Sequence, residues 1–270
     1  MNKIFVVDAF VTNKPFSGNP AGVCLLDNWK PDIWMQNVAS EMKHSETAFV
    51  VKNDSGFAIR YFTPTIEVPL CGHATLASAF ILWEEGVVPQ YEEIVFHAKG
   101  GTLKIKKVKC PKGEKDTVRM GFPLSLFQEV NDFDTKILDN LSLKPISVYQ
   151  SEDDVIFELS TEKEVQNYKP DFHAMKNIPY RMIIITANSE KSDLDFVSRV
   201  FAPTAGIDED PATGIAHCIL GPLWAKKLKK QTLSAYQSSQ RGAQFGLSLE
   251  NNHIQLFGRA RLVLKGNVVV

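Results

Sequence analysis

The sequence has no surplus of charge of either sign, because 30 Lys and Arg residues face 31 Asp and Glu residues. A chain without a basic surplus has no electrostatic basis for binding nucleic acid or an anionic membrane. No apolar run approaches the roughly 20 residues that a membrane-spanning helix needs. The N-terminal stretch reads as a strand and lacks signal-peptide anatomy, because Asp8 interrupts it. We therefore expect a cytoplasmic protein without nucleic-acid or membrane partners.

Cysteine is also scarce, with four in 270 residues. They are Cys24, Cys71, Cys110 and Cys218. No two form the CxxC pair typical of zinc sites, so a zinc site is not expected. Separated cysteines without a secretion signal fit free thiols in a reducing compartment. Nucleotide, flavin and metal motifs are lacking too, so the sequence predicts no cofactor and no bound metal.

One fragment occurs twice, about 140 residues apart. Each copy reads Arg-x-Phe-x-Pro, a short turn, small residues and then an apolar run. The copies are residues 60–64 with 71–75, and residues 199–203 with 211–215. Their intervals differ by one residue, which indicates two lobes built to one plan. Functional sites often form where such lobes meet.

The first apolar run, residues 72–83, is apolar on every side. Such a helix is normally buried on every side, so a sheet should wrap around it. Further helices are expected at 213–228 and at 32–43, the latter with Ile33, Val38 and Met42 facing inward. Strands are expected at 2–12, 21–26, 47–51, 57–62, 92–98, 101–109, 116–121, 146–149, 154–160, 181–187, 240–249, 254–257 and 260–264.

These elements suggest an N-terminal lobe at residues 1–118, completed by 259–270, and a C-terminal lobe at 119–258. The sequence has no low-complexity linker between them, so we expect the lobes to pack directly on each other.

Five short motifs lie between residues 8 and 217. They are Asp8-Ala9-Phe10, Phe16-Ser17-Gly18-Asn19-Pro20-Ala21, Ser45-Glu46-Thr47-Ala48-Phe49, Cys71-Gly72-His73-Ala74-Thr75 and Asp208-Glu209-Asp210-Pro211-Ala212-Thr213-Gly214. In this order they resemble the PhzF-like proteins, the phenazine-biosynthesis isomerase family, and the chain length also fits.

The resemblance implies an α+β fold of the diaminopimelate-epimerase type. In that fold two pseudo-symmetric lobes each wrap a mostly antiparallel sheet or barrel around a central buried helix, and the active site lies in the interlobe cleft. The implied activity is that of a cofactor-independent isomerase that moves a proton on a small carboxylate substrate. We further expect a homodimer with a biosynthetic role.

Glu46 lies between an expected helix and an expected strand, where a side chain can face a cleft. Read alone it is most often a solvated loop carboxylate, but it matches the family's catalytic glutamate. A carboxylate that moves protons at carbon works best when partial burial raises its pKa. His73 is either a helix-terminal histidine or a hydrogen-bond donor to the substrate and proton-relay partner of Glu46. The resemblance favours the functional role for both.

Asp210 reads as a helix N-cap, and the resemblance makes it a catalytic residue that contacts the substrate. The helix starts at Gly72 and at Thr213–Gly214 are expected to bind the substrate carboxylate through backbone N–H groups. The loop at Gly18–Asn19 adds a third small, polar segment. All these glycines could equally be packing positions. Asp208 and Glu209 are weaker candidates that complement the helix dipole.

Cys71 raises a separate mechanism, because racemases of this fold use two cysteines on opposite sides of one carbon. The internal repeat places Pro211 at the second position, and proline cannot transfer a proton. A thiol enzyme using Cys71 with His73 is weaker still, since residues two apart on a helix do not face each other. Cys71 is therefore expected to be a small buried residue.

The chain departs from the phenazine enzyme at Ile215, where that enzyme has a substrate-contacting serine. The lost polar contact argues against the same dihydro-hydroxyanthranilate substrate. An alternative of another class is a non-catalytic ligand-binding or interaction protein that retains the fold. Proton exchange on small carboxylates discriminates between the two functions.

Overall fold

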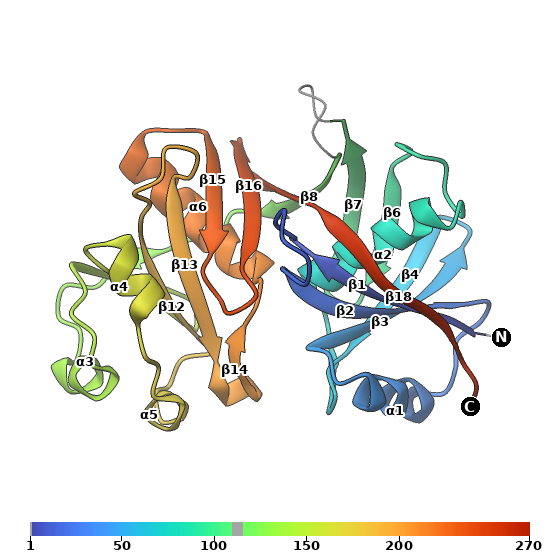
Figure 1. The fold of residues 1–270 in the computed structure, drawn as a ribbon, viewed down its shortest axis with the longest axis horizontal. Helices are drawn as coiled ribbons and strands as arrows, with labels where there is room; N and C mark the ends of the chain where they lie inside the picture. Colours follow the sequence, from blue (N-terminus) through green and yellow to red (C-terminus); the bar gives the residue numbers. More distant parts are fainter. Residues whose placement is uncertain (1, 110–115) are drawn as a thin grey trace. The chain divides into compact units, whose positions relative to one another are not determined.

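The computed structural model describes residues 2–109 and 116–270. Contacts divide the chain into two compact units, Met1–Gly121 with Leu256–Val270, and Phe122–Gln255. The ribbon in Figure 1 shows the elements of each unit. Cys110, one of the four cysteines expected to be free, lies outside the described residues.

The first unit is built on strands that pair in the order β18–β1–β2–β3–β4–β6–β7–β8, with β5 on β4. Their bounds are β1 (Asn2–Ala9), β2 (Asn19–Leu26), β3 (Glu46–Asn53), β4 (Gly56–Phe62), β5 (Glu67–Val68), β6 (Ile94–Ala98), β7 (Gly101–Val108), β8 (Thr117–Pro123) and β18 (Ala260–Val268). The pairs β2–β3 and β4–β6 are parallel, and the others are antiparallel.

Helix α2 (Gly72–Glu84) lies inside the curve of these strands, whereas α1 (Asp32–Met42) covers their outer face (Figure 1). The small and apolar residues of α2 are buried from His73 to Ala79 and again from Ile81 to Trp83. The prediction of a helix buried within a wrapped sheet is therefore confirmed.

The second unit pairs its strands in the order β9–β10–β11–β12–β13–β15–β16, with β14 on β13. The strands are β9 (Gln128–Glu129), β10 (Ser147–Ser151), β11 (Asp154–Glu158), β12 (Met182–Asn188), β13 (Phe196–Ala202), β14 (Ile207–Asp210), β15 (Thr232–Gln237) and β16 (Ala243–Glu250). Strand β17 (His253–Gly258) begins in this unit and ends in the first. The helices are α3 (Thr135–Leu141), α4 (Glu162–Asn167), α5 (Phe172–Lys176), the 3-10 turn η1 (Pro203–Ala205) and α6 (Gly214–Leu228).

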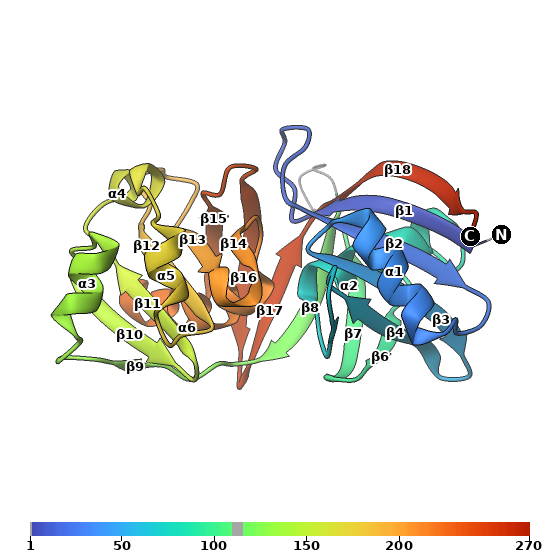
Figure 2. The ribbon, with the colours of Figure 1, turned by 90° about the horizontal axis from the view of Figure 1, so that it is seen from below.

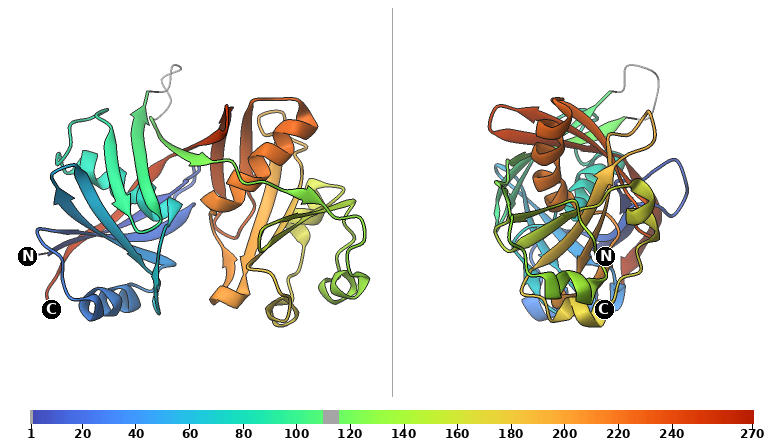
Figure 3. Two further views of the ribbon diagram at one scale, coloured as in Figure 1. Left: turned by 180° about the vertical axis from the view of Figure 1, so that it is seen from behind. Right: turned by 90° about the vertical axis from the view of Figure 1, so that its left-hand side faces the viewer.

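Within this unit, α6 covers one face of the sheet and α3, α4 and α5 cover the other (Figures 2 and 3). Strand β12 shows how the sequence fits this arrangement. Ile183 and Ile185 pack in the apolar cluster under α3–α5, and Thr186 accepts a hydrogen bond from Trp224 of α6 at 3.0 Å. A strand covered on both faces reads as a continuous apolar run, as this one does.

The two units share one pattern of strand directions. In the first, β2 and β3 are parallel, β3 and β4 antiparallel, and β4 and β6 parallel. In the second, β11, β12, β13 and β15 repeat this series. Each unit also inserts its central helix, α2 or α6, at the same point of the series. The predicted α+β fold of two pseudo-symmetric halves is confirmed. The duplicated fragment is the part of the sequence in which this repeat can be recognised.

The arginine of each repeated fragment clamps a short strand onto its neighbour. Arg60 on β4 donates from Nε and Nη2 to Glu67 on β5 at 2.8 and 2.9 Å. Arg199 on β13 donates in the same way to Glu209 on β14 at 2.8 and 2.9 Å. Glu209, which we expected to complement a helix dipole, instead has this ion pair. The repeated arginines thus have a structural role.

Several local predictions were wrong. Strands β13 and β15 and helices α3–α5 were not predicted, because their short segments carry no clear period. In α1 the inward residues are Met35, Val38 and Ala39, while Ile33 is 68% exposed. Val38 faces inward as predicted, but the inward stripe begins at Met35, two residues after Ile33. Among the described residues, no helix is both long enough and apolar enough to cross a membrane.

His217 of α6 should make the stability of the second unit depend on pH. It is stacked on Phe245 with ring centroids 3.7 Å apart, and burial lowers its pKa to about 4. The unfolded chain, with a histidine pKa of about 6.5, binds more protons below that pH. The free energy of unfolding should therefore fall as the pH drops from about 6.5 towards 4, by about 1.4 kcal/mol per unit.

His217→Gln should reduce that slope by about one proton. Urea unfolding at several pH values between neutrality and about 5 measures the slope. An unchanged slope in a folded variant would assign the acid sensitivity to other groups.

Candidate active site

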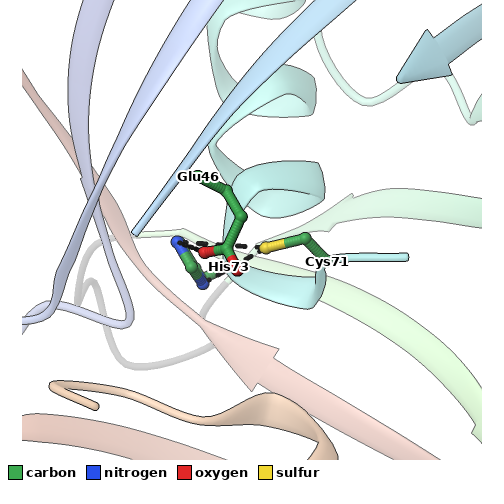
Figure 4. A group of neighbouring side chains, drawn as sticks. All are labelled: Glu46, Cys71 and His73. Atoms are coloured by element: carbon green, nitrogen blue, oxygen red, sulfur yellow. Dashed lines mark hydrogen bonds and ion pairs between the residues drawn. The ribbon is translucent and has the colours of Figure 1, made fainter. Parts of the chain in front are cut away.

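Three side chains from two elements of the first unit converge (Figure 4). Glu46 is the first residue of β3, Cys71 is the N-cap of α2, and His73 is the second residue of that helix. Parallel pairing of Ala21 with Glu46 fixes where β3 begins. The start of a strand and the start of the buried helix therefore present their side chains to one point.

The contacts within this cluster are short. His73 Nε2 lies 3.3 Å from Glu46 Oε2, and the two side chains are 6% and 14% exposed. Cys71 Sγ lies 3.4 Å from His73 Nδ1. The cluster combines a carboxylate, an imidazole and a thiol at the rim of the first unit's core.

The contact between Cys71 and His73 corrects the sequence argument that they cannot face each other. That argument assumed that both residues are helical. Cys71 instead has an extended backbone, with φ −144° and ψ 114°. An extended N-cap directs its side chain differently from a helical residue, so it can contact the second helical position.

His73 is neutral at neutral pH. Burial and, to a smaller extent, the nearby His44 lower the pKa of His73 to about 3. A neutral imidazole carries one proton, and its hydrogen-bond partners select the nitrogen. Asn19 Nδ2, a donor, lies 3.4 Å from Nδ1. The proton then belongs on Nε2, which lies 3.3 Å from Oε2 of the Glu46 carboxylate.

Asn19 reaches His73 because of the glycine before it. Gly18 has φ +78°, and a Cβ there would lie 2.2 Å from the carbonyl oxygen of Ala9. Only glycine fits this close backbone approach. Asn19 itself is fully buried at the start of β2. For Gly18 the packing interpretation is therefore sufficient, and Asn19 is the residue of that loop that contacts the cluster.

The predicted residues of the second unit form their own network. Asp210 ends β14, and its Oδ2 accepts from Thr213 Oγ1 at 2.5 Å. Asp210 is not the N-cap of α6: Thr213 has that position, and the helix begins at Gly214. When the two central helices are compared by their N-caps, Thr213 rather than Pro211 corresponds to Cys71. Neither Thr213 nor Pro211 has a thiol, so the argument against a cysteine pair stands.

Sequence reasoning missed Gln237, the last residue of β15. Its Oε1 accepts from Thr213 N at 2.9 Å, and its Nε2 donates to Asp210 O at 2.6 Å and to Thr213 Oγ1 at 3.1 Å. Gln237 is fully buried and holds the segment before α6 in place. No signal pointed to it, because β15 itself was not predicted.

Ile215 is the second residue of α6 and is 45% exposed. An apolar side chain at the exposed helix start gives this region a different surface from the serine expected by resemblance. That a substrate contacts Asp210, Thr213 and Gly214 stays a prediction.

Comparison with known proteins gives a consistent result. The model of the PhzC-PhzF family, phenazine biosynthesis-like protein, matches residues 7–267. An uncharacterized isomerase of Halalkalibacterium halodurans is 42% identical over 267 residues, which cover 99% of this chain and 98% of the relative. A crystal structure of a putative phenazine biosynthesis PhzC/PhzF protein from Clostridium difficile superimposes with a TM-score of 0.90 at 37% identity, covering all of both chains.

A more distant structure extends the likeness in fold alone. A hydroxyproline epimerase from Agrobacterium vitis, crystallised with trans-4-hydroxy-L-proline, has a TM-score of 0.64 at 12% identity, covering 98% of this chain and 91% of the epimerase. Because the family match spans almost the whole chain and the relatives at 42% identity are named isomerases, this chain belongs to the phenazine biosynthesis-like family and is a PhzF-like isomerase.

Proposed function

We propose that the protein moves a proton from one carbon to another on a small carboxylate substrate, with Glu46 as the acid and base. One observation carries this proposal: a carboxylate at the edge of the core, 14% exposed, contacts a buried neutral imidazole at 3.3 Å. Glu46 can reach a substrate while water has limited access to it. That environment suits proton transfer at carbon.

In the proposed reaction, Glu46 takes a proton from a carbon made acidic by a neighbouring carbonyl or carboxylate group. The electron pair of the broken C–H bond delocalises toward that group. Glu46, now protonated, returns the proton to a different carbon, so no redox partner is required. His73 positions Glu46, because its Nε2 lies 3.3 Å from Oε2 while Asn19 Nδ2 lies 3.4 Å from Nδ1.

The substrate class is supported by charge and by likeness in fold. A neutral His73 adds no positive charge, so we assign recognition of the substrate anion to the backbone N–H groups at the start of α2, at Gly72. The hydroxyproline epimerase of similar fold holds an amino acid, itself a small carboxylate.

The test is a screen of small carboxylates for exchange of carbon-bound hydrogen in heavy water, each paired with its amide. We expect exchange with at least one acid, while its amide binds far more weakly by calorimetry. Equal binding of acid and amide would contradict anion recognition. Binding without exchange by any acid in the screen would favour a non-catalytic binding protein of the same fold.

Cys71 is proposed to have no part in proton transfer. Its shorter contact with His73 is to Nδ1, at 3.4 Å, and it lies 3.9 Å from Nε2, whereas Glu46 contacts Nε2 at 3.3 Å. Cys71→Ser should therefore retain most of the exchange activity, within about tenfold, apart from the stability cost of a buried hydroxyl. Complete loss of exchange in a folded Cys71→Ser protein would instead support a thiol mechanism.

A further inference from the structure

The Glu46, Cys71 and His73 cluster has the composition of a metal site. Among residues 2–109 and 116–270, these side chains bring a carboxylate oxygen, a sulfur and an imidazole nitrogen within 4.8 Å of one another. Cys71 and His73 are buried and Glu46 is partly buried. Figure 4 shows all three side chains directed toward one point. The sequence analysis expected no zinc site, because no CxxC pair is present, whereas folding assembles this donor set from separate segments.

Two of the three donor–donor distances are close to those around a tetrahedral ion. Zinc bonds of about 2.0–2.1 Å to nitrogen and oxygen and 2.3 Å to sulfur place donors about 3.3–3.6 Å apart. His73 Nε2 and Glu46 Oε2 are 3.3 Å apart. Cys71 Sγ and His73 Nε2 are 3.9 Å apart, which requires a shift of a few tenths of an ångström. Nε2 therefore faces both other donors at nearly the right distance.

The surroundings also support binding. Thiolate, imidazole and carboxylate together suit a borderline-soft ion such as Zn²⁺ better than Mg²⁺ or Ca²⁺, which prefer oxygen. Binding through Nε2 places the imidazole proton on Nδ1. The Asn19 amide at 3.4 Å can turn its oxygen to accept that proton, as outer partners of ligating histidines do.

We propose that Glu46, Cys71 and His73 bind one Zn²⁺ ion, with the fourth position left to water or to a substrate carboxylate. Binding releases the thiol proton of Cys71 and moves the His73 proton from Nε2 to Nδ1. The ion then occupies the oxygen of Glu46 that would accept a proton. Zinc should therefore inhibit the proposed proton transfer reversibly, and this consequence rests on the proposed function. Zinc binding itself does not depend on that function.

The experiment uses untagged, full-length protein freed of metal by a chelator. Calorimetry with ZnCl₂ should give one site per chain. Co²⁺ as a spectroscopic probe should give the near-ultraviolet band of a cobalt–thiolate bond. Cys71→Ser should lose that band and weaken zinc binding by about 100-fold or more, since losing even an outer partner costs about 10- to 100-fold. Glu46→Gln should weaken binding but keep the band.

The controls are Cys24→Ala and Cys218→Ala, which remove buried free thiols elsewhere in the chain and should leave the band and the affinity unchanged. No zinc binding by the wild type, or a cobalt–thiolate band that survives in folded Cys71→Ser, would overturn the site. Hydrogen exchange, measured with chelator present, reports on the proposed activity separately. Zinc binding without exchange would reject the activity and keep the site, and exchange without zinc binding would do the reverse.

Discussion

Replacing Glu46 with glutamine is expected to abolish substrate hydrogen exchange while leaving substrate binding largely intact. Glutamine keeps the size of the side chain and an oxygen that can lie against His73 Nε2, which is 3.3 Å from Oε2 in the wild type. It cannot accept a proton from carbon. General acid–base groups contribute about 100- to 10,000-fold, so the exchange rate should fall by about 1,000-fold or more. Exchange is measured in heavy water with the best acid from the screen, and binding by calorimetry.

The matched control is Glu41→Gln, which removes an exposed carboxylate from α1 in the same unit. It changes the net charge equally and should exchange at the wild-type rate. Normal exchange by Glu46→Gln would remove Glu46 from the mechanism. Loss of both binding and exchange in a folded Glu46→Gln protein would mean that the carboxylate shapes the site rather than transfers the proton.

Replacing Arg199 with methionine should destabilise the second unit far more than Arg60→Met destabilises the first. Both arginines make the same bidentate ion pair, but their surroundings differ. The Arg199 side chain is 10% exposed and that of Arg60 is 25% exposed. Arg199 Nη1 also donates to the carbonyl oxygen of Tyr168 at 2.7 Å. Its removal leaves buried acceptors and the Glu209 carboxylate without a donor, at a cost of about 3 kcal/mol.

Arg60→Met should lower the free energy of unfolding by about 1 kcal/mol, because water can replace much of the hydrogen bonding that Arg60 provides to Glu67 and to the exposed Asp32. Urea unfolding followed by circular dichroism gives both values from the shift of the transition midpoint. Equal losses in the two variants would show that burial does not distinguish the two copies of the clamp.

Much of the architecture was accessible from the sequence, because it is carried by strong local signals. The run around Leu76 is apolar on all sides, which is explained only by a helix inside a sheet. The repeated fragment predicted two similar halves, and the strand directions of the units bear this out. The short helices α3–α5 were not predicted because they have at most seven residues, which is too few to show a helical periodicity.

The sequence by itself determined the central helix of each unit, through the periodicity of short segments. It determined the fold class, and selected Glu46 and His73 as candidates, through the resemblance of its motifs to the PhzF-like proteins. Only the tertiary structure decided which side chains meet. The contact of Cys71 with His73 depends on an extended N-cap backbone. The network of Gln237 with Thr213 and Asp210 depends on the register of a strand well removed along the chain. The spacing of residues along the sequence predicts neither of these contacts, because the distances between the side chains depend on how the strands pair and where each helix begins.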